Sequence, residues 1–283
     1  MGFSIFPLDL LVLRLKQFIV PLLTWLSFAT CCHGEEGLLP ADPKILDIIF
    51  SGRETLHYSI AWTGGIKIGD LHLTVNHAES GDDFIIHARV TDYGLFKLFY
   101  PVDDTFTTHV RGPWKLPYRY EVEQREGWGN ETRRLTRYDQ QNLQVRYRKN
   151  DDPEQVFPLQ GFVHNEYSSF FITRALVFNG DDIIVPTFAD KKRHEVVVRM
   201  LGREKKKSMF GEVDTIRVMP KMNFRGLYDK DGDTVFWLTD DDCRIPVEIK
   251  SKILIGSLTA TLQEYSNPRC EEDGRPLPSL PNN

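Results

Sequence analysis

The chain has 283 residues, of which 41% are hydrophobic and 27% are charged, and these proportions are those of an ordinary globular protein. Its 40 acidic and 35 basic residues leave a formal net charge of -5. That balance argues against a nucleic-acid-binding surface, because phosphate contacts need an excess of Lys and Arg. The length is sufficient for one large domain or two small ones.

The N-terminal residues have the pattern of a secretory signal peptide. Arg14 and Lys16 precede an apolar run over residues 18–30, and small residues follow before the pair Glu35-Glu36. The run is shorter than the roughly 20 residues that a helix needs to cross a bilayer. We therefore expect residues 1–34 to be a cleavable signal peptide, and the mature protein to be periplasmic or secreted without a transmembrane span.

Two alternatives to this simple export stay open, and the translation start is open as well. Cys31 and Cys32 follow the apolar run at the place where a lipoprotein is lipidated, although residues 28–30 fit the lipidation pattern poorly. The apolar run can also remain uncleaved as an anchor. Because the basic residues lie far from the start of the chain, translation can instead begin near Val12 or Leu13, which leaves a compact signal.

The rest of the chain is dominated by an alternation of apolar and polar residues, which is typical of half-buried β-strands. Tyr58, Ile60 and Trp62 show the pattern first, and turns rich in Gly and Asp separate the successive segments. Such short links favour antiparallel neighbours. We expect roughly ten strands, with later segments at 103–111, 117–126, 131–138, 142–149, 193–204, 209–220 and 233–239.

One segment has helical spacing instead. Aromatic and aliphatic residues over 166–178 recur as on one face of a helix, Asn165 suits its N-cap, and Asn179-Gly180 suits its end. We expect this helix to cover the apolar side of a curved sheet. A shorter helix is expected within 40–50.

These patterns divide the chain into four parts. Residues 1–34 are the signal peptide, 35–51 a lead-in and 52–266 the β domain. Four prolines after residue 267 predict a disordered tail over 267–283.

Two cysteines lie in the predicted mature chain, and export would place them in an oxidising compartment. Cys243 and Cys270 flank two strand-like segments, 244–253 and 257–266, which a turn near residues 254–256 would join as a hairpin. The ends of this hairpin bring the two cysteines into the same neighbourhood, so a disulfide is one expectation. The other is a buried Cys243 and an unbonded Cys270 in the tail.

Five stretches of the chain carry a resemblance to a known family, namely 167–174, 198–204, 236–241, 244–247 and 255–262. Their order and spacing are similar to those of the bacterial exported family called domain of unknown function 3108, over about residues 52–266. The resemblance implies an open antiparallel half-barrel similar in shape to the LolA and LolB periplasmic carriers, and it implies no catalytic residues. With the helix expected over 166–178, the expected fold is mainly β, with one helix against the concave apolar face.

Three histidines raise the possibility of metal binding. If Gly64-Gly65 is a two-residue hairpin loop, His57 faces His72 directly, and a hairpin centred on Gly81 would place His87 diagonally beside His72. Cβ atoms of paired residues lie about 5 Å apart, which suits imidazoles that share a metal. The alternatives are a solvated polar face, or a bulge near residues 67–69 that would shift the register and scatter the histidines.

Aromatic residues mark the expected ligand-binding face. Most of them should form the core, but ligand sites are also largely apolar with a few polar anchors. Arg174, with Arg89 and Arg111, is a candidate anchor for an anionic head group. The candidate ligand-binding residues are Trp62, Phe96, Phe99, Tyr100, Phe170, Phe171, Arg174 and Trp237.

Taken together, the sequence favours a non-enzymatic envelope protein that binds or carries a hydrophobic or lipidated ligand, such as a lipid or a lipoprotein. We expect no cofactor. The alternatives are a metal-dependent enzyme that uses the histidines, and a structural partner of another envelope protein.

Overall fold

The computed structural model describes residues 39–79, 81–94, 100–221, 234–253 and 256–271. The described residues all belong to one compact unit, Leu39–Asn283. Residues 1–38 lie outside the described residues, so the signal peptide and its alternatives stay predictions. Within the described part, no helix is both long enough and apolar enough to span a membrane.

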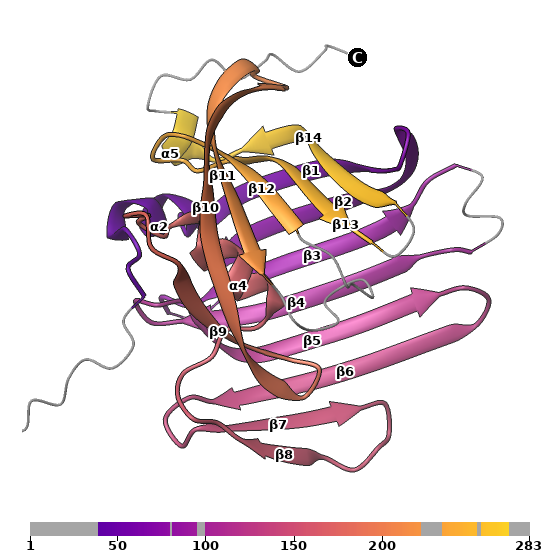
Figure 1. The fold of residues 1–283 in the computed structure, drawn as a ribbon. Helices are drawn as coiled ribbons and strands as arrows, with labels where there is room; N and C mark the ends of the chain where they lie inside the picture. The colour runs from indigo at the N-terminus through magenta and orange to yellow at the C-terminus, as the bar shows by residue number, and fades with distance from the viewer. Residues whose placement is uncertain (1–38, 80, 95–99, 222–233, 254–255, 272–283) are drawn as a thin grey trace, which may run out of the picture. The chain divides into compact units, whose positions relative to one another are not determined.

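Fourteen strands form a single antiparallel sheet in the part of the chain that the structure describes (Figure 1). The spatial order is β8-β7-β6-β5-β4-β3-β2-β1-β14-β13-β12-β11-β10-β9. The bounds are β1 Arg53–Trp62, β2 Ile66–His77, β3 Phe84–Asp92, β4 Asp103–Arg111, β5 Leu116–Glu126, β6 Asn130–Asp139, β7 Gln144–Lys149, β8 Gln155–Pro158, β9 Ile183–Ala189, β10 Lys192–Ser208, β11 Gly211–Lys221, β12 Thr234–Thr239, β13 Pro246–Lys252 and β14 Ser257–Ser266.

This order is two meanders joined along β1 and β14. Each strand within a meander pairs with its neighbour in sequence, and the chain passes from the first meander to the second through the helix α4 (Glu166–Arg174). β8 and β9 end the order and do not pair, so the sheet stays open. Their side chains still approach, because the ring of Phe188 in β9 lies 5.8 Å from that of Phe157 in β8.

The predicted mainly β, open antiparallel fold is confirmed, but the sheet has more strands than the ten expected. The additional strands include β8 and β9, the two edges of the sheet. Each contains a proline, Pro158 and Pro186 respectively, and proline weakens the strand signal because it donates no ladder hydrogen bond. Edge strands tolerate this loss, which is why these two segments pair in the structure despite their sequences.

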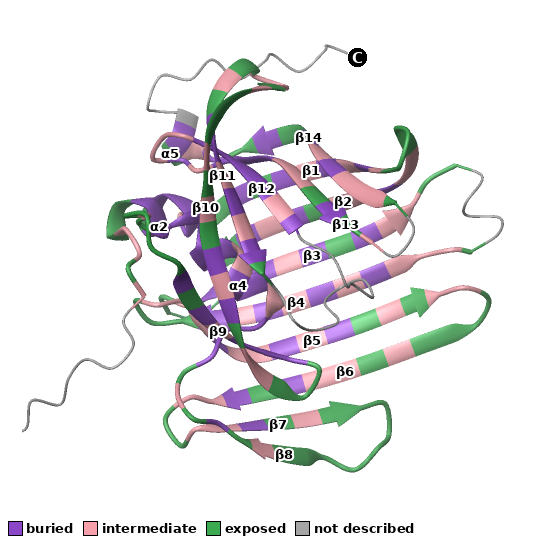
Figure 2. Ribbon diagram, viewed as in Figure 1, coloured by how far each residue is buried: buried purple, intermediate pink, exposed green. Residues whose placement is uncertain are grey.

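α4 packs on one face of the sheet, which we call the inner face. Leu56 and Tyr58 of β1 are fully buried there, and buried and more exposed residues alternate along the central strands (Figure 2). The N-terminus of α4 is fixed as predicted by Asn165, whose side chain accepts from the backbone N–H of Ser168 while the Ser168 hydroxyl accepts from the N–H of Asn165.

The helix ends at Arg174, four residues before the predicted end. Leu176 instead forms an isolated antiparallel bridge with Ala41, and the N–H of Val177 donates to the carbonyl of Pro40 at 2.7 Å. The lead-in therefore supplies a partner for the segment that the helical spacing had assigned to α4. Within this lead-in, α2 (Pro43–Ile49) is the short helix expected over 40–50, and it begins at the N-cap Asp42.

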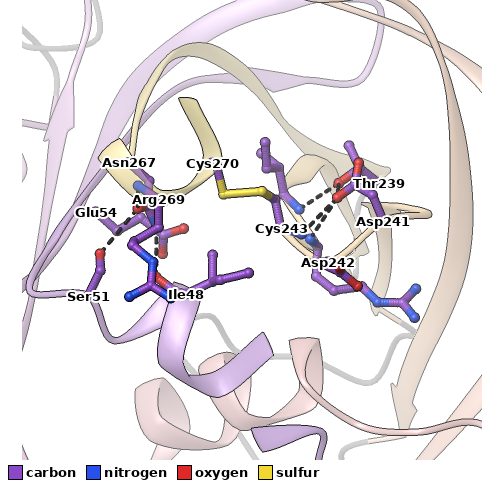
Figure 3. The surroundings of a disulfide bond; sticks show 12 residues. Ile48, Ser51, Glu54, Thr239, Asp241, Asp242, Cys243, Asn267, Arg269 and Cys270 are labelled. Atoms are coloured by element: carbon purple, nitrogen blue, oxygen red, sulfur yellow. Dashed lines mark hydrogen bonds between the residues drawn. A yellow bond between two sulfur atoms is a disulfide. The ribbon is translucent and has the colours of Figure 1, made fainter. Parts of the chain in front are cut away.

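The structure contains the Cys243–Cys270 disulfide, with the two Cα atoms 5.9 Å apart. β13 and β14 form the expected hairpin between the cysteines. Figure 3 shows Cys243 in the turn held by the Asp241 carboxylate, which accepts from the N–H of Cys243 at 2.9 Å, and Cys270 on the short helix α5 (Pro268–Glu271).

The folded part extends beyond the predicted boundary at residue 266. Asn267 is fully buried, and its side-chain amide donates to the carbonyl of Ile48 in α2 at 2.9 Å. The disulfide and this hydrogen bond hold α5 against the sheet, which the proline content of the segment did not indicate. Residues 272–283 of the predicted tail lie outside the described residues.

Candidate ligand-binding cavities

An apolar cavity of about 160 Å³ lies between α4 and the inner face of the sheet. Phe170 of α4 lines it on one side, and Ile60, Phe236 and Ala260 line it from three different strands. The lining is almost entirely apolar because these strand positions belong to the buried half of the alternation. We call this space the central cavity.

A second apolar cavity of about 340 Å³ adjoins the central one, and we call it the outer cavity. Trp62, Val90 and Tyr100 line it, and it shares Ile60 and Leu258 with the central cavity. Two shared residues place the spaces side by side along β1 and β14. Together they offer an apolar path that is longer than either cavity alone.

A third cavity, of about 160 Å³, is polar. Its lining includes Tyr120, Tyr138, Arg134 and Lys191, and it shares Glu166 with the central cavity. We call it the polar cavity. Glu166 is the first residue of α4, so the N-terminus of the helix lies at the boundary between an apolar and a polar space.

The carboxyl group of Glu166 is poorly satisfied. Its Oε2 atom is buried and has no hydrogen-bond partner in the described part of the chain. Burial raises the pKa of Glu166 to about 7, against the smaller opposing effect of its own backbone N–H and of Arg134. A carboxyl group in this state changes its charge near neutral pH, whereas an exposed glutamate does so near its ordinary pKa of 4.5.

The predicted ligand-binding residues are only partly brought together. Trp62 and Tyr100 line the outer cavity and Phe170 lines the central one, whereas Phe96 and Phe99 lie outside the described residues.

Two further predicted ligand-binding residues, Phe171 and Trp237, do not line any of the three cavities. Phe171 is fully buried in the core, where its ring packs on that of Phe50. Trp237 lies on the opposite face from Phe236, where its indole N–H donates to Glu204 at 2.6 Å and Lys206 covers its ring. Neighbouring strand residues point to opposite faces, so the aromatic run at 236–237 supplies one cavity residue and one outer-face residue.

The prediction that Arg174 anchors a ligand is wrong. Its guanidinium is fully buried and donates to both carboxylate oxygens of Glu54, at 2.6 and 2.7 Å, and to the carbonyl oxygens of Cys243 and Arg244. The hydroxyl of Tyr265 also donates to Glu54. These contacts leave Arg174 no exposed donor for a head group, and its partner Glu54 lies too far along the sequence for spacing to indicate it.

The histidines lie as the pairing argument proposed. His57 pairs with His72 and their rings stack with centroids 4.2 Å apart, while His87 lies opposite Thr74, diagonally from His72. These residues are on the outer face, away from the cavities. Within the described residues, no group of three or more His, Cys, Asp or Glu side chains is placed to hold a metal ion, so the geometry gives the metal hypothesis no support.

That histidine register results from two deviations that cancel. The first hairpin loop has three residues between Trp62 and Ile66, one more than assumed, and a bulge at Ile68 restores the alignment. The bulge depends on Gly69, because a Cβ atom at that position would lie 2.4 Å from the carbonyl oxygen of Thr91.

Glu166 and Arg134 were not found from the sequence. A glutamate at the first position of a helix is an ordinary helix start, and an arginine in an alternating strand reads as an exposed residue. Only the folded arrangement places them on one polar cavity.

These features define an open β-sheet protein that contains adjoining apolar and polar cavities. The chain belongs to the family described as protein of unknown function, DUF3108, which matches residues 57–263. None of the curated proteins matches the chain.

Among solved structures, the chain is similar to a beta-barrel-like protein of domain of unknown function DUF1849 from Brucella abortus, with a TM-score of 0.54 and 10% sequence identity. The similarity covers 76% of this chain and 97% of that chain. At this identity it shows a shared fold alone.

Proposed function

We propose that this protein is a non-catalytic binding or carrier module of the bacterial cell envelope, and that a hydrophobic ligand occupies the central and outer cavities. The observation that carries the proposal is the apolar path of two adjoining cavities beside α4, which share Ile60 and Leu258. Small-molecule sites are typically concave and mostly apolar. The signal-peptide pattern over residues 1–34 and the resemblance to periplasmic carriers support the envelope location.

The fold also supports binding rather than packing alone. A sheet of this size normally fills its inner face with side chains, since protein interiors are close-packed. Here α4 covers the inner face, but it is only nine residues long and leaves space beside Phe170. A carrier needs such space, and the sheet is open as well, because β8 and β9 at its two ends do not pair with each other in the described part of the chain.

The experiment that tests the proposal fills the central cavity in the full-length chain. Ala260 lines this cavity, and Ala260→Phe should lower the affinity for the neutral fluorescent probe N-phenyl-1-naphthylamine by about tenfold or more, which corresponds to about 1.4 kcal/mol. Ala61→Phe is the matched control, because Ala61 follows Ile60 on β1 and so points to the outer face. Fluorescence titration measures both.

Thermal melting of both variants confirms that each is folded before titration. Equal probe affinity in the two variants would contradict the proposal, as would a wild-type chain that binds no probe. Native mass spectrometry of the purified chain gives a second reading, since an extra mass that organic extraction removes would identify a bound lipid.

A further inference from the structure

Beside the apolar path lies a cavity of different chemistry, and the two meet at one residue. The polar cavity and the central cavity share Glu166, and no other residue is common to the two linings. A ligand that crosses this boundary has an apolar part on one side of the α4 N-terminus and a polar part on the other.

The polar cavity contains an arginine whose charge is not paired. The Nη2 atom of Arg134 donates to the neutral amide oxygen of Gln124 at 2.8 Å, and its Nε atom is buried and has no hydrogen-bond partner in the described parts of the chain. Within the described residues, Arg134 forms no ion pair with a carboxylate. A buried donor left without a partner costs free energy, so a site with such a donor favours an acceptor that reaches it.

The surroundings of Arg134 favour an anion. Lys191, in the turn between β9 and β10, also lines the cavity, with its amino group 5.0 Å from the ring centre of Tyr147. Burial raises the pKa values of Tyr120 and Tyr138 well above the ordinary value, so both hydroxyls stay protonated and remain donors. A cationic head group would instead be repelled by Arg134 and Lys191.

Two acidic groups in the cavity lining, Asp190 and Glu166, oppose this positive charge, and Glu126 of β5 also interacts electrostatically with Arg134 from outside the lining. Their effect depends on pH, because burial raises the pKa of Glu166 to about 7. Below that pH the Glu166 carboxyl is mostly neutral, and the cavity carries one more positive than negative charge. The neutral carboxyl then donates a hydrogen bond to an anion rather than repelling it.

We infer that the polar cavity is the head-group site for an anionic amphiphile with a single alkyl chain, whose chain occupies the central cavity and whose head group is bound by Arg134 and Lys191. This inference rests on the proposed function, since it assumes that the apolar path holds the chain. The head group is a carboxylate or a phosphate monoester, because both present the oxygen acceptors that a guanidinium binds.

The test compares ligands that differ only in the head group, namely decanoate, decyl phosphate and 1-decanol. Each displaces N-phenyl-1-naphthylamine from the full-length chain at pH 6. At least one anion should bind about tenfold more tightly than 1-decanol, and the tighter of the two anions identifies the head group. Arg134→Gln should remove this preference while the affinity for 1-decanol stays the same.

Arg137→Gln is the matched control, because Arg137 is on the same strand, points to the outer face and pairs with Glu154 at 3.2 Å. It should keep the preference of the wild type. Lys191→Gln is a second test variant at an exposed position, and it should weaken anion binding without unfolding the chain.

The outcomes separate the inference from the proposed function. If 1-decanol binds as tightly as both anions, or if Arg134→Gln and Arg137→Gln have the same effect, the head-group site is wrong and the apolar site stands. If the wild-type chain binds the probe but none of the three ligands displaces it, the head-group site is wrong, and if the chain does not bind the probe at all, the proposed function fails as well. A preference that weakens between pH 6 and pH 8, and does not do so in Glu166→Gln, supports the role of Glu166.

Discussion

The two ends of α4 differ in how their charged side chains are satisfied. At the C-terminal end, Arg174 donates to both carboxylate oxygens of Glu54, and backbone carbonyls accept its remaining hydrogen bonds. At the N-terminal end, Glu166 and the facing Arg134 each keep a buried polar atom that has no hydrogen-bond partner among the described residues. Proteins satisfy nearly all of their buried polar groups, so the first end is complete by itself and the second is the one that a ligand would complete.

The largest expected effect on unfolding free energy comes from breaking the Glu54–Arg174 ion pair at the C-terminal end of α4. Arg174→Met leaves the Glu54 carboxylate buried without its partner, and breaking a buried ion pair in this way costs about 3–5 kcal/mol of unfolding free energy. Urea unfolding measures the change. Arg199→Met is the control, because Arg199 pairs with Asp182 at the exposed surface and such pairs contribute about 1 kcal/mol or less.

The double variant Glu54→Leu/Arg174→Met sharpens this prediction. It removes both charges, so it should recover part of the stability that Arg174→Met loses. An Arg174→Met protein as stable as Arg199→Met would show that the C-terminal end of α4 does not depend on the ion pair, and the contrast between the two ends would then be wrong.

The next largest effect concerns the disulfide, which lies beside the C-terminal end of α4, where the carbonyl of Cys243 accepts from Arg174. Replacing both Cys243 and Cys270 by Ser should lower the unfolding free energy by about 3.5 kcal/mol, because the unfolded chain regains the conformational entropy that a cross-link across a sequence separation of 27 removes. Urea unfolding with and without reductant checks this value in the wild type. Probe binding by the folded variant should not change, because neither cysteine lines the central, outer or polar cavity.

A folded double-serine protein that no longer binds the probe would contradict the contrast between the two ends of α4. The disulfide would then shape the cavities and not only the surroundings of the C-terminal end of α4. Reduction of the wild type provides the same test without a substitution. An unchanged urea midpoint after reduction would show that the bond contributes nothing to stability.

The sequence indicated the class of fold better than the site. Period-two alternation is a local property, so the antiparallel pairing of His57 with His72 and the β13–β14 hairpin followed from it. Long-range pairing has no local signal. The Glu54–Arg174 ion pair joins residues 120 positions apart, and it turned a predicted ligand anchor into part of the core.

The same limit explains why the polar cavity was missed. Its residues come from β5, β6, β7, α4, β9 and the turn after β9, which the fold brings together only because β9 lies across from β6. The contact between Tyr138 and Phe188, whose ring centres lie 6.1 Å apart, is the kind of packing that no alternation pattern specifies. Pockets depend on such packing, so sequence patterns place strands more reliably than cavities.

The smallest predicted effect is a pH dependence of the unfolding free energy, which tests Glu166 at the N-terminal end of α4 directly. Because burial raises the pKa of Glu166 from 4.5 to about 7, the folded chain binds this proton more tightly than the unfolded chain does. Unfolding free energy therefore falls as pH rises between these two values, and it should not do so in Glu166→Gln. The variant should be more stable than the wild type by about 3 kcal/mol or less at pH 8, and equally stable near pH 4.

Urea unfolding of both proteins from pH 4 to pH 8 measures this difference. The wild-type curve alone is not sufficient, because burial also lowers the pKa of His164 to about 3, and stability that depends on neutral His164 is lost as the pH falls. That contribution is the same in both proteins, so subtracting the curves isolates Glu166. A difference that does not vary with pH would show that the Glu166 carboxyl is already satisfied, and the two ends of α4 would then be alike.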